Sequence, residues 1–142
     1  MLYLDSSALM KLYVSEPGSA GMEESVRANV PLLVTSRIAY AEVLSGLNRC
    51  FIGGRISASA YRAQKKIFLA DWNGLSKIEV TDETLQSADA LIGRHSLRGF
   101  DAIHLCSALC VGHPSFACFD QRLRMAAERE GLELVPPSGR AS

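Results

Sequence analysis

The sequence lacks a net charge and any long hydrophobic run. Its 142 residues include 15 Lys and Arg against 15 Asp and Glu, a balance that excludes binding of nucleic acid through overall basicity. No apolar run approaches the roughly 20 residues needed to cross a bilayer. Asp5 interrupts the apolar start too early for a signal peptide. We therefore expect a soluble, cytoplasmic protein without a membrane partner.

Glycine-rich phosphate-binding motifs are absent as well. Neither G-x-G-x-x-G nor G-x-x-x-x-G-K-S/T occurs, which argues against dinucleotide binding and against a P-loop. The cysteines are Cys50, Cys106, Cys110 and Cys118. A domain rich in aliphatic residues does not need them paired in a reducing compartment, so we expect buried thiols.

Short apolar runs alternate with amphipathic stretches along the chain, and 48% of the residues are hydrophobic. This alternation predicts an α/β fold with a parallel sheet between layers of helices. We expect one domain over residues 1–135 and a flexible tail over 136–142. The expected strands are 1–4, 30–34, 76–80 and 116–119, with 132–135 as an additional one, and the expected helices begin near residues 6, 19, 36, 57, 82, 101 and 121. The first helix is expected to carry Leu9, Leu12 and Tyr13, and Thr35 or Ser36 is expected to cap the third.

Three aspartates follow strands or begin helices in this pattern. Asp5 comes after the first strand, Asp120 after the strand 116–119, and Asp101 lies at a helix start. Each alone is a common helix cap. Carboxyl ends of parallel strands nevertheless share one edge of the sheet, so we expect the three to meet there. Glu42 lies inside a helix, where it cannot be an N-cap and needs another reason.

Carboxylates that converge repel one another unless cations neutralise them. Oxygen ligands suit Mg²⁺ or Mn²⁺, whereas zinc favours His and Cys. Divalent ions held by carboxylates commonly activate water and stabilise the oxygens of an in-line displacement at phosphorus. The acidic set therefore predicts phosphodiester hydrolysis.

Four ordered segments carry a resemblance to a known family. They are Leu2-Tyr3-Leu4-Asp5-Ser6-Ser7-Ala8-Leu9, Ala41-Glu42-Val43, Phe100-Asp101-Ala102-Ile103-His104-Leu105 and Phe119-Asp120. Together they resemble the acidic motifs of PIN-domain ribonucleases, especially VapC-type toxins, over nearly the whole chain. Ser6 stands where many relatives have Thr, an exchange that keeps the hydroxyl.

The resemblance implies a Rossmann-like three-layer sandwich with a parallel sheet of four to five strands. It implies Mg²⁺- or Mn²⁺-dependent cleavage of RNA, a homodimer, and control by a small cognate antitoxin that docks near Ser6–Lys11 and Glu16–Asn29. Carried over by position, Asp5 and Asp101 are principal metal ligands, Glu42 and Asp120 complete the catalytic acidic site, and Ser6 supports it.

Weaker substrate-binding candidates flank these acids. His104 lies three residues after Asp101 and so near its helical face, although a partly buried helix residue bonded to backbone or to a carboxylate is the simpler interpretation. Arg98 precedes the same helix. Arg37 and Arg49 border Glu42 on its helix, where a solvated surface is the simpler interpretation. Arg98 is the residue we favour for an RNA phosphate.

Two other functions remain open. One is a non-catalytic interaction module in which the acids only cap helices. The other is phosphoryl transfer through Asp5, although position 7 is Ser where a second acid is expected. Metal-dependent cleavage of RNA that Asp5→Asn abolishes separates catalysis from both.

Overall fold

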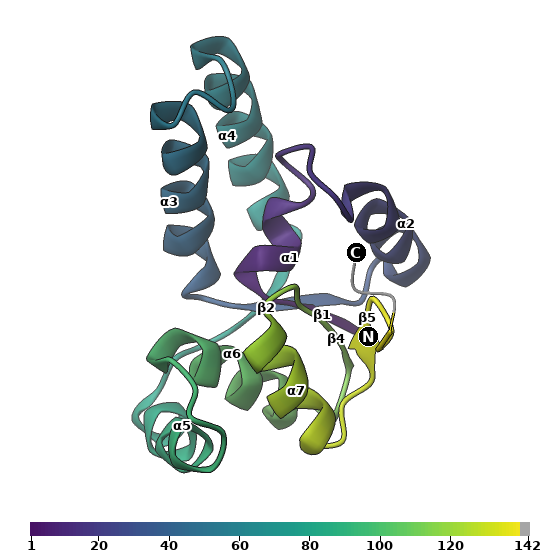
Figure 1. The fold of residues 1–142 in the computed structure, drawn as a ribbon, viewed down its shortest axis with the longest axis vertical. Coiled ribbons are helices and arrows are strands. Elements are labelled where there is room, and N and C mark those ends of the chain that lie inside the picture. Colours follow the sequence, from purple (N-terminus) through teal and green to yellow (C-terminus); the bar gives the residue numbers. More distant parts are fainter. Residues whose placement is uncertain (140–142) are drawn as a thin grey trace.

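A parallel sheet in the strand order β3-β2-β1-β4-β5 forms the centre of the molecule. The computed structural model describes residues 1–139, and its five strands confirm the expected fold class (Figure 1). The strands are β1 (Leu2–Leu4), β2 (Leu33–Ser36), β3 (Ser76–Ile78), β4 (Ser115–Ala117) and β5 (Leu134–Val135). The central position of β1 brings the residue after it, Asp5, to the middle of the carboxyl edge.

Helices cover both faces of the sheet (Figure 1). The first layer contains α1 (Ser6–Met10), α2 (Ser19–Asn29), α3 (Ala39–Ile52) and α4 (Ala58–Trp72), and the second contains α5 (Asp82–His95), α6 (Gly99–Cys110) and α7 (Gln121–Arg129). Side chains of a strand alternate between the two faces. The sheet has a hydrophobic core on each face, the first core under the first layer of helices and the second core under the second layer. Leu2 and Leu4 accordingly pack in the first core, and Tyr3 packs in the second.

Side-chain caps fix where several helices begin. The Asp5 carboxylate accepts the Ala8 N–H at the start of α1, and the Asp120 carboxylate accepts the Leu123 N–H at the start of α7. Thr81 forms a capping box with Thr84 on α5. Two of the candidate acids therefore do cap helices, as their simpler interpretation requires, and both also lie at the edge of the sheet.

Several expected boundaries were wrong by a few residues. Strand β2 begins at Leu33 rather than Val30, because Pro31 has no N–H for a ladder and the Leu32 N–H turns back to the Asn29 carbonyl at 2.7 Å. Neither Thr35 nor Ser36 is the N-cap of α3. Both belong to β2, and the Thr35 hydroxyl donates to the Leu4 carbonyl at 2.7 Å.

Other differences affect the acidic residues directly. Strand β4 ends at Ala117, since the Phe119 N–H donates to the Ser7 hydroxyl at 2.9 Å instead of to a strand. Helix α6 begins at Gly99, so Asp101 lies in its first turn and does not cap it. The first helix was expected to carry the Leu12 and Tyr13 positions, but α1 ends at Met10.

The buried side chain of Arg124 connects the segment after β5 to the loop before Asp120. Arg124 on α7 is 3% exposed and donates to the Cys118 carbonyl at 2.8 Å and to the Pro136 carbonyl at 2.7 Å. The expected tail thus begins with an anchored residue, and its last positions, 140–142, lie outside the described residues. Arg124 stabilises the β4–α7 loop that leads to Asp120.

Two further expectations concern thiols and membranes. Three cysteines are buried as expected, whereas Cys110 at the end of α6 is exposed because it faces away from the core. Among residues 1–139, no helix has the length and hydropathy to cross a bilayer.

Candidate active site

A cleft of about 610 Å³ opens at the carboxyl edge of the sheet. The four candidate acids come from four separate segments of the chain, and all of them line it. The lining residues are Asp5, Ser6, Ser7, Met10, Glu42, Arg49, Arg98, Gly99, Phe100, Asp101, His104 and Asp120. The topology therefore brings together residues as distant as 5 and 120.

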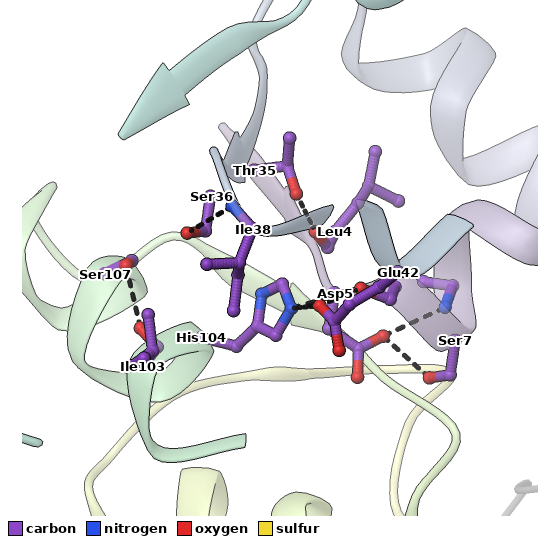
Figure 2. Close-up of polar contacts among 12 residues, drawn as sticks. Leu4, Asp5, Ser7, Thr35, Ser36, Ile38, Glu42, Ile103, His104 and Ser107 are labelled. Carbon is purple, nitrogen blue, oxygen red and sulfur yellow. Dashed lines mark hydrogen bonds and ion pairs between the residues drawn. The ribbon is translucent and has the colours of Figure 1, made fainter. Parts of the chain in front are cut away.

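Asp5 forms the buried centre of the cleft, with 4% of its surface exposed. Its Oδ1 accepts the Ser7 hydroxyl at 2.7 Å (Figure 2). The same oxygen accepts the Ala8 N–H at 2.9 Å. Burial raises the pKa of the Asp5 carboxyl, while His104 and the Ser7 hydrogen bond act in the opposite direction. A nearby cation stabilises the charged form of a carboxylate that has been removed from water in this way.

Ser7 connects two of the acids, a role that sequence reasoning missed. Its hydroxyl donates to Asp5 and accepts the Phe119 N–H at 2.9 Å. It therefore ties the start of α1 to the residue immediately before Asp120. Only the Asp-Ser-Ser run hinted at a second functional hydroxyl, because the contact to Phe119 spans 112 residues.

Asp101 and Asp120 lie on the other side of the cleft and share a cation. The Arg98 guanidinium lies 3.4 Å from Asp101 Oδ2 and 3.3 Å from Asp120 Oδ2. Burial, then the charge of Asp120, raises the pKa of Asp101, and Arg98 opposes this increase. Since the Arg98 side chain is 78% exposed, water screens much of its charge. Arg98 therefore neutralises the negative charges of Asp101 and Asp120 only in part.

Glu42 faces the cleft from the first turn of α3, where two donors hold it. The Ser6 hydroxyl donates to Oε1. His104 Nε2 lies 2.7 Å from the same oxygen (Figure 2). Burial acts to raise the pKa of Glu42, but the hydrogen bond and charge of His104 outweigh it and lower that pKa. His104 is 1% exposed, and Tyr3 occupies its Nδ1 at 2.8 Å. No ring nitrogen is left free for a direct contact with substrate.

The donor set has the chemistry of a hard divalent cation site. It offers carboxylate oxygens and the Ser6 hydroxyl, and two of its acids have pKa values raised by burial. Within residues 1–139, no three His, Cys, Asp or Glu side chains are grouped as a formed metal site. Arg98 contacts two of the acids, Asp101 and Asp120, and His104 contacts a third, Glu42.

A smaller cavity of about 300 Å³ adjoins the cleft. Ser7, Met10 and Arg49 line both cavities. Lys11 and Arg55 also line the smaller one, and both pair with Glu16, at 3.5 Å and 2.9 Å. Arg49 instead donates to the Ser45 hydroxyl at 2.7 Å, which leaves its charge without a carboxylate partner within the described part of the chain.

Comparisons with known proteins show the family to which the chain belongs. The model of the PIN domain family matches residues 2–129. Ribonuclease VapC45 of Mycobacterium tuberculosis is 32% identical over 138 residues, which cover 96% of this chain and 95% of the relative.

Solved structures share the fold. The crystal structure of Mycobacterium tuberculosis VapC20, a Sarcin-Ricin loop cleaving toxin, superposes with a TM-score of 0.70 at 20% identity, covering 89% of this chain and 95% of that one. A toxin-antitoxin complex from Klebsiella pneumoniae gives a TM-score of 0.64 at 18% identity, covering 84% and 87%. Taken with the family match and the VapC relative, the acidic cleft identifies this chain as a member of the PIN-domain family, within the group of VapC ribonucleases.

Proposed function

We propose that this protein is a metal-dependent endoribonuclease and the toxin of a toxin–antitoxin pair. The observation that carries the proposal is the cleft in which Asp5, Glu42, Asp101 and Asp120 come together at the carboxyl edge of the sheet. Relatives that match nearly the whole chain are named ribonucleases, which supports RNA as the substrate. The acids supply the chemistry, and the family supplies the substrate class.

The proposed cofactor is Mg²⁺, with Mn²⁺ as the alternative. Divalent-metal dependence is general among PIN-domain ribonucleases, and Asp5 and Asp101 would be the principal ligands, with Glu42, Asp120 and the supporting Ser6 completing the set. When bound, the cation would polarise the phosphate and help to ionise water. The low dielectric around Asp5 strengthens its attraction for any cation in the cleft.

The protein's own residues then position the RNA. We propose that Arg98, at the exposed rim beside Asp101 and Asp120, binds a phosphate next to the scissile bond. Arg49 is placed to bind a second phosphate, because it separates the acidic cleft from the adjoining cavity. A cleft carboxylate accepts the proton that the attacking water gives up, and the products carry 5′-phosphate and 3′-hydroxyl ends.

The proposed partners follow from the family and from the shape of one surface. A solved neighbour is a toxin-antitoxin complex. A cavity of about 500 Å³ lies between α2 and residues 135–137, against the segment Glu16–Asn29 where we expect an antitoxin to dock. We further propose a homodimer that acts in the cytoplasm without a membrane partner.

The test measures cleavage of a panel of structured RNAs with Mg²⁺, with EDTA, and with the Asp5→Asn protein. Asn keeps the shape of Asp5 and can still cap α1, so loss of activity reports chemistry rather than folding. We expect cleavage that both EDTA and the substitution abolish, with 5′-phosphate ends. Cleavage that survives both controls contradicts the proposal. Absence of metal-dependent turnover on every RNA favours the non-catalytic interaction module.

A further inference from the structure

A buried hydrogen-bonded chain lies beneath the acidic cleft. Tyr3 of β1, His104 of α6, Glu42 of α3 and Ser6 of α1 contact one another through side chains. The Tyr3 hydroxyl lies 2.8 Å from His104 Nδ1, and His104 Nε2 lies 2.7 Å from Glu42 Oε1. Elements from three separate regions of the sequence, residues 3–6, 42 and 104, thus meet through a single imidazole ring.

The direction of these hydrogen bonds follows from what each group can donate. An ionised Glu42 carboxylate can only accept a hydrogen bond, so in a neutral His104 ring Nδ1 is the acceptor and the Tyr3 hydroxyl is its donor. The ring proton then lies on Nε2 and is donated to Glu42 Oε1. Ser6 donates to the same oxygen. Glu42 Oε2 has no hydrogen bond within residues 1–139 and is left for the cleft.

The chain of contacts leads from the core to the cleft. Tyr3 is fully buried and His104 is 1% exposed, whereas the Glu42 side chain is 25% exposed. Burying this many polar groups in a core is costly unless every one is paired. A carboxylate on the first turn of α3 would otherwise rotate freely toward water. The network fixes the orientation of Glu42 and directs one oxygen into the cleft.

We propose that His104 and Tyr3 are positioning residues that hold Glu42 as a ligand for a divalent cation. The proposal rests on the function inferred above, since it concerns the same cleft. Partners that hold a metal-ligating side chain typically affect metal affinity or activity by about 10- to 100-fold when they are removed. His104 contributes through Glu42, and Tyr3 contributes through His104.

Tyr3→Phe is the most informative variant. The hydroxyl of Tyr3 does not line the cleft, so it touches neither cation nor RNA. The Phe ring keeps the stacking on Phe116, whose centroid lies 5.4 Å away. We expect Mn²⁺ affinity, measured by electron paramagnetic resonance on the protein without RNA, to fall about 3- to 10-fold. We expect kcat to fall about tenfold with the KM for RNA unchanged.

Tyr13→Phe is the matched control. Tyr13 is also a buried tyrosine, and its hydroxyl donates to Asp71 at 2.9 Å in the first core, away from the lining of the cleft. The same atom is removed in both variants. Tyr13→Phe is expected to lose some stability while keeping wild-type Mn²⁺ affinity and kcat.

Substitution of His104 supplies a second arm. The amide of His104→Gln can donate to Glu42 from a position similar to that of Nε2, whereas His104→Leu has no donor. We expect His104→Gln to retain at least about ten times the Mn²⁺ affinity of His104→Leu. Thermal unfolding shows whether each variant folds before its affinity is compared.

The outcomes separate this inference from the proposed function. The inference is overturned if Tyr3→Phe keeps wild-type Mn²⁺ affinity and kcat, or if Tyr3→Phe and Tyr13→Phe lose Mn²⁺ affinity and kcat equally. It is also overturned if the two His104 variants have equal Mn²⁺ affinities, or if the wild-type protein binds no Mn²⁺. If the wild-type protein binds Mn²⁺ but cleaves no RNA, the proposed function fails and the Mn²⁺ measurements still decide this inference.

Discussion

Replacing Ser7 with Ala removes one hydroxyl that serves both sides of the acidic cleft. That hydroxyl donates to Asp5 at 2.7 Å and accepts the Phe119 N–H at 2.9 Å. A hydrogen bond to an ionised group contributes about 1.5–3 kcal/mol, and an unpaired, partly buried N–H costs about 1 kcal/mol or more. Allowing for water that reaches the half-buried site, we expect the free energy of unfolding to fall by about 2–3 kcal/mol.

The assay is urea denaturation of the Ser7→Ala protein without divalent ions. An unchanged m-value with a lower midpoint shows that stability has fallen without a change in the surface exposed on unfolding. We also expect kcat on RNA to fall about tenfold under conditions where the variant is folded, because Asp5 and the residue before Asp120 lose their common anchor.

Ser57→Ala is the control for this prediction. Ser57 caps α4 through the Ala60 N–H at 3.1 Å on an exposed surface, so its loss is expected to cost about 1 kcal/mol and to leave kcat unchanged. A loss below about 1 kcal/mol in Ser7→Ala, or equal effects of the two variants on kcat, would refute the assignment of Ser7 as the link between the acids.

Three other predictions test charge in and around the cleft. Asp101→Asn removes repulsion from Asp120 and is expected to gain about 0.5 kcal/mol of stability without divalent ions. Mg²⁺ at a hundred times its Kd should raise wild-type stability by about 2.7 kcal/mol in thermal unfolding and raise that of the variant by less. Equal gains would contradict a ligand role for Asp101. Hydrogen bonds from His95 and Arg94 lower the pKa of Glu130, so Glu130 stabilises the fold above the usual glutamate pKa and this benefit is lost as the pH falls through the lowered value. Glu130→Gln should cost about 1 kcal/mol at pH 7 in urea unfolding, and the cost should shrink steadily as the pH falls below the usual glutamate pKa. Arg49→Ala should raise the KM for RNA about tenfold and reduce the slope of log KM against log salt by about 0.7, whereas the same change at Arg62 on α4 should do neither.

Much of the fold could be predicted because its signals are local. The alternation of apolar runs and amphipathic stretches predicted the α/β class, and the Asp120 carboxylate caps its helix as its position suggested. Boundaries failed where a distant partner decided them. Thr35 was expected to cap a helix, but the Leu4 carbonyl on the neighbouring strand takes its hydroxyl.

The site was predictable for its acids and less so for their supports. Asp5 and Asp120 follow strands, so parallel topology alone brings them to one edge. The supporting contacts depend on residues far apart: Tyr3 and His104 are separated by 101 positions, and no local pattern encodes such a pair. The simpler interpretation of His104, a partly buried helix residue bonded to a carboxylate, agrees with its contact to Glu42. Its burial against Tyr3 depends on how α6 packs on the sheet.

The buried guanidinium of Arg124 has a consequence for how the protein can be extended. It joins the carbonyls of Cys118 and Pro136, so the loop leading into the cleft depends on residues that follow the last strand. A reporter or purification tag joined directly after Val135 would replace the residue whose carbonyl Arg124 binds, and would so weaken a support of the loop before Asp120. Fusions designed to leave the enzyme intact should keep at least the natural residues through Pro136.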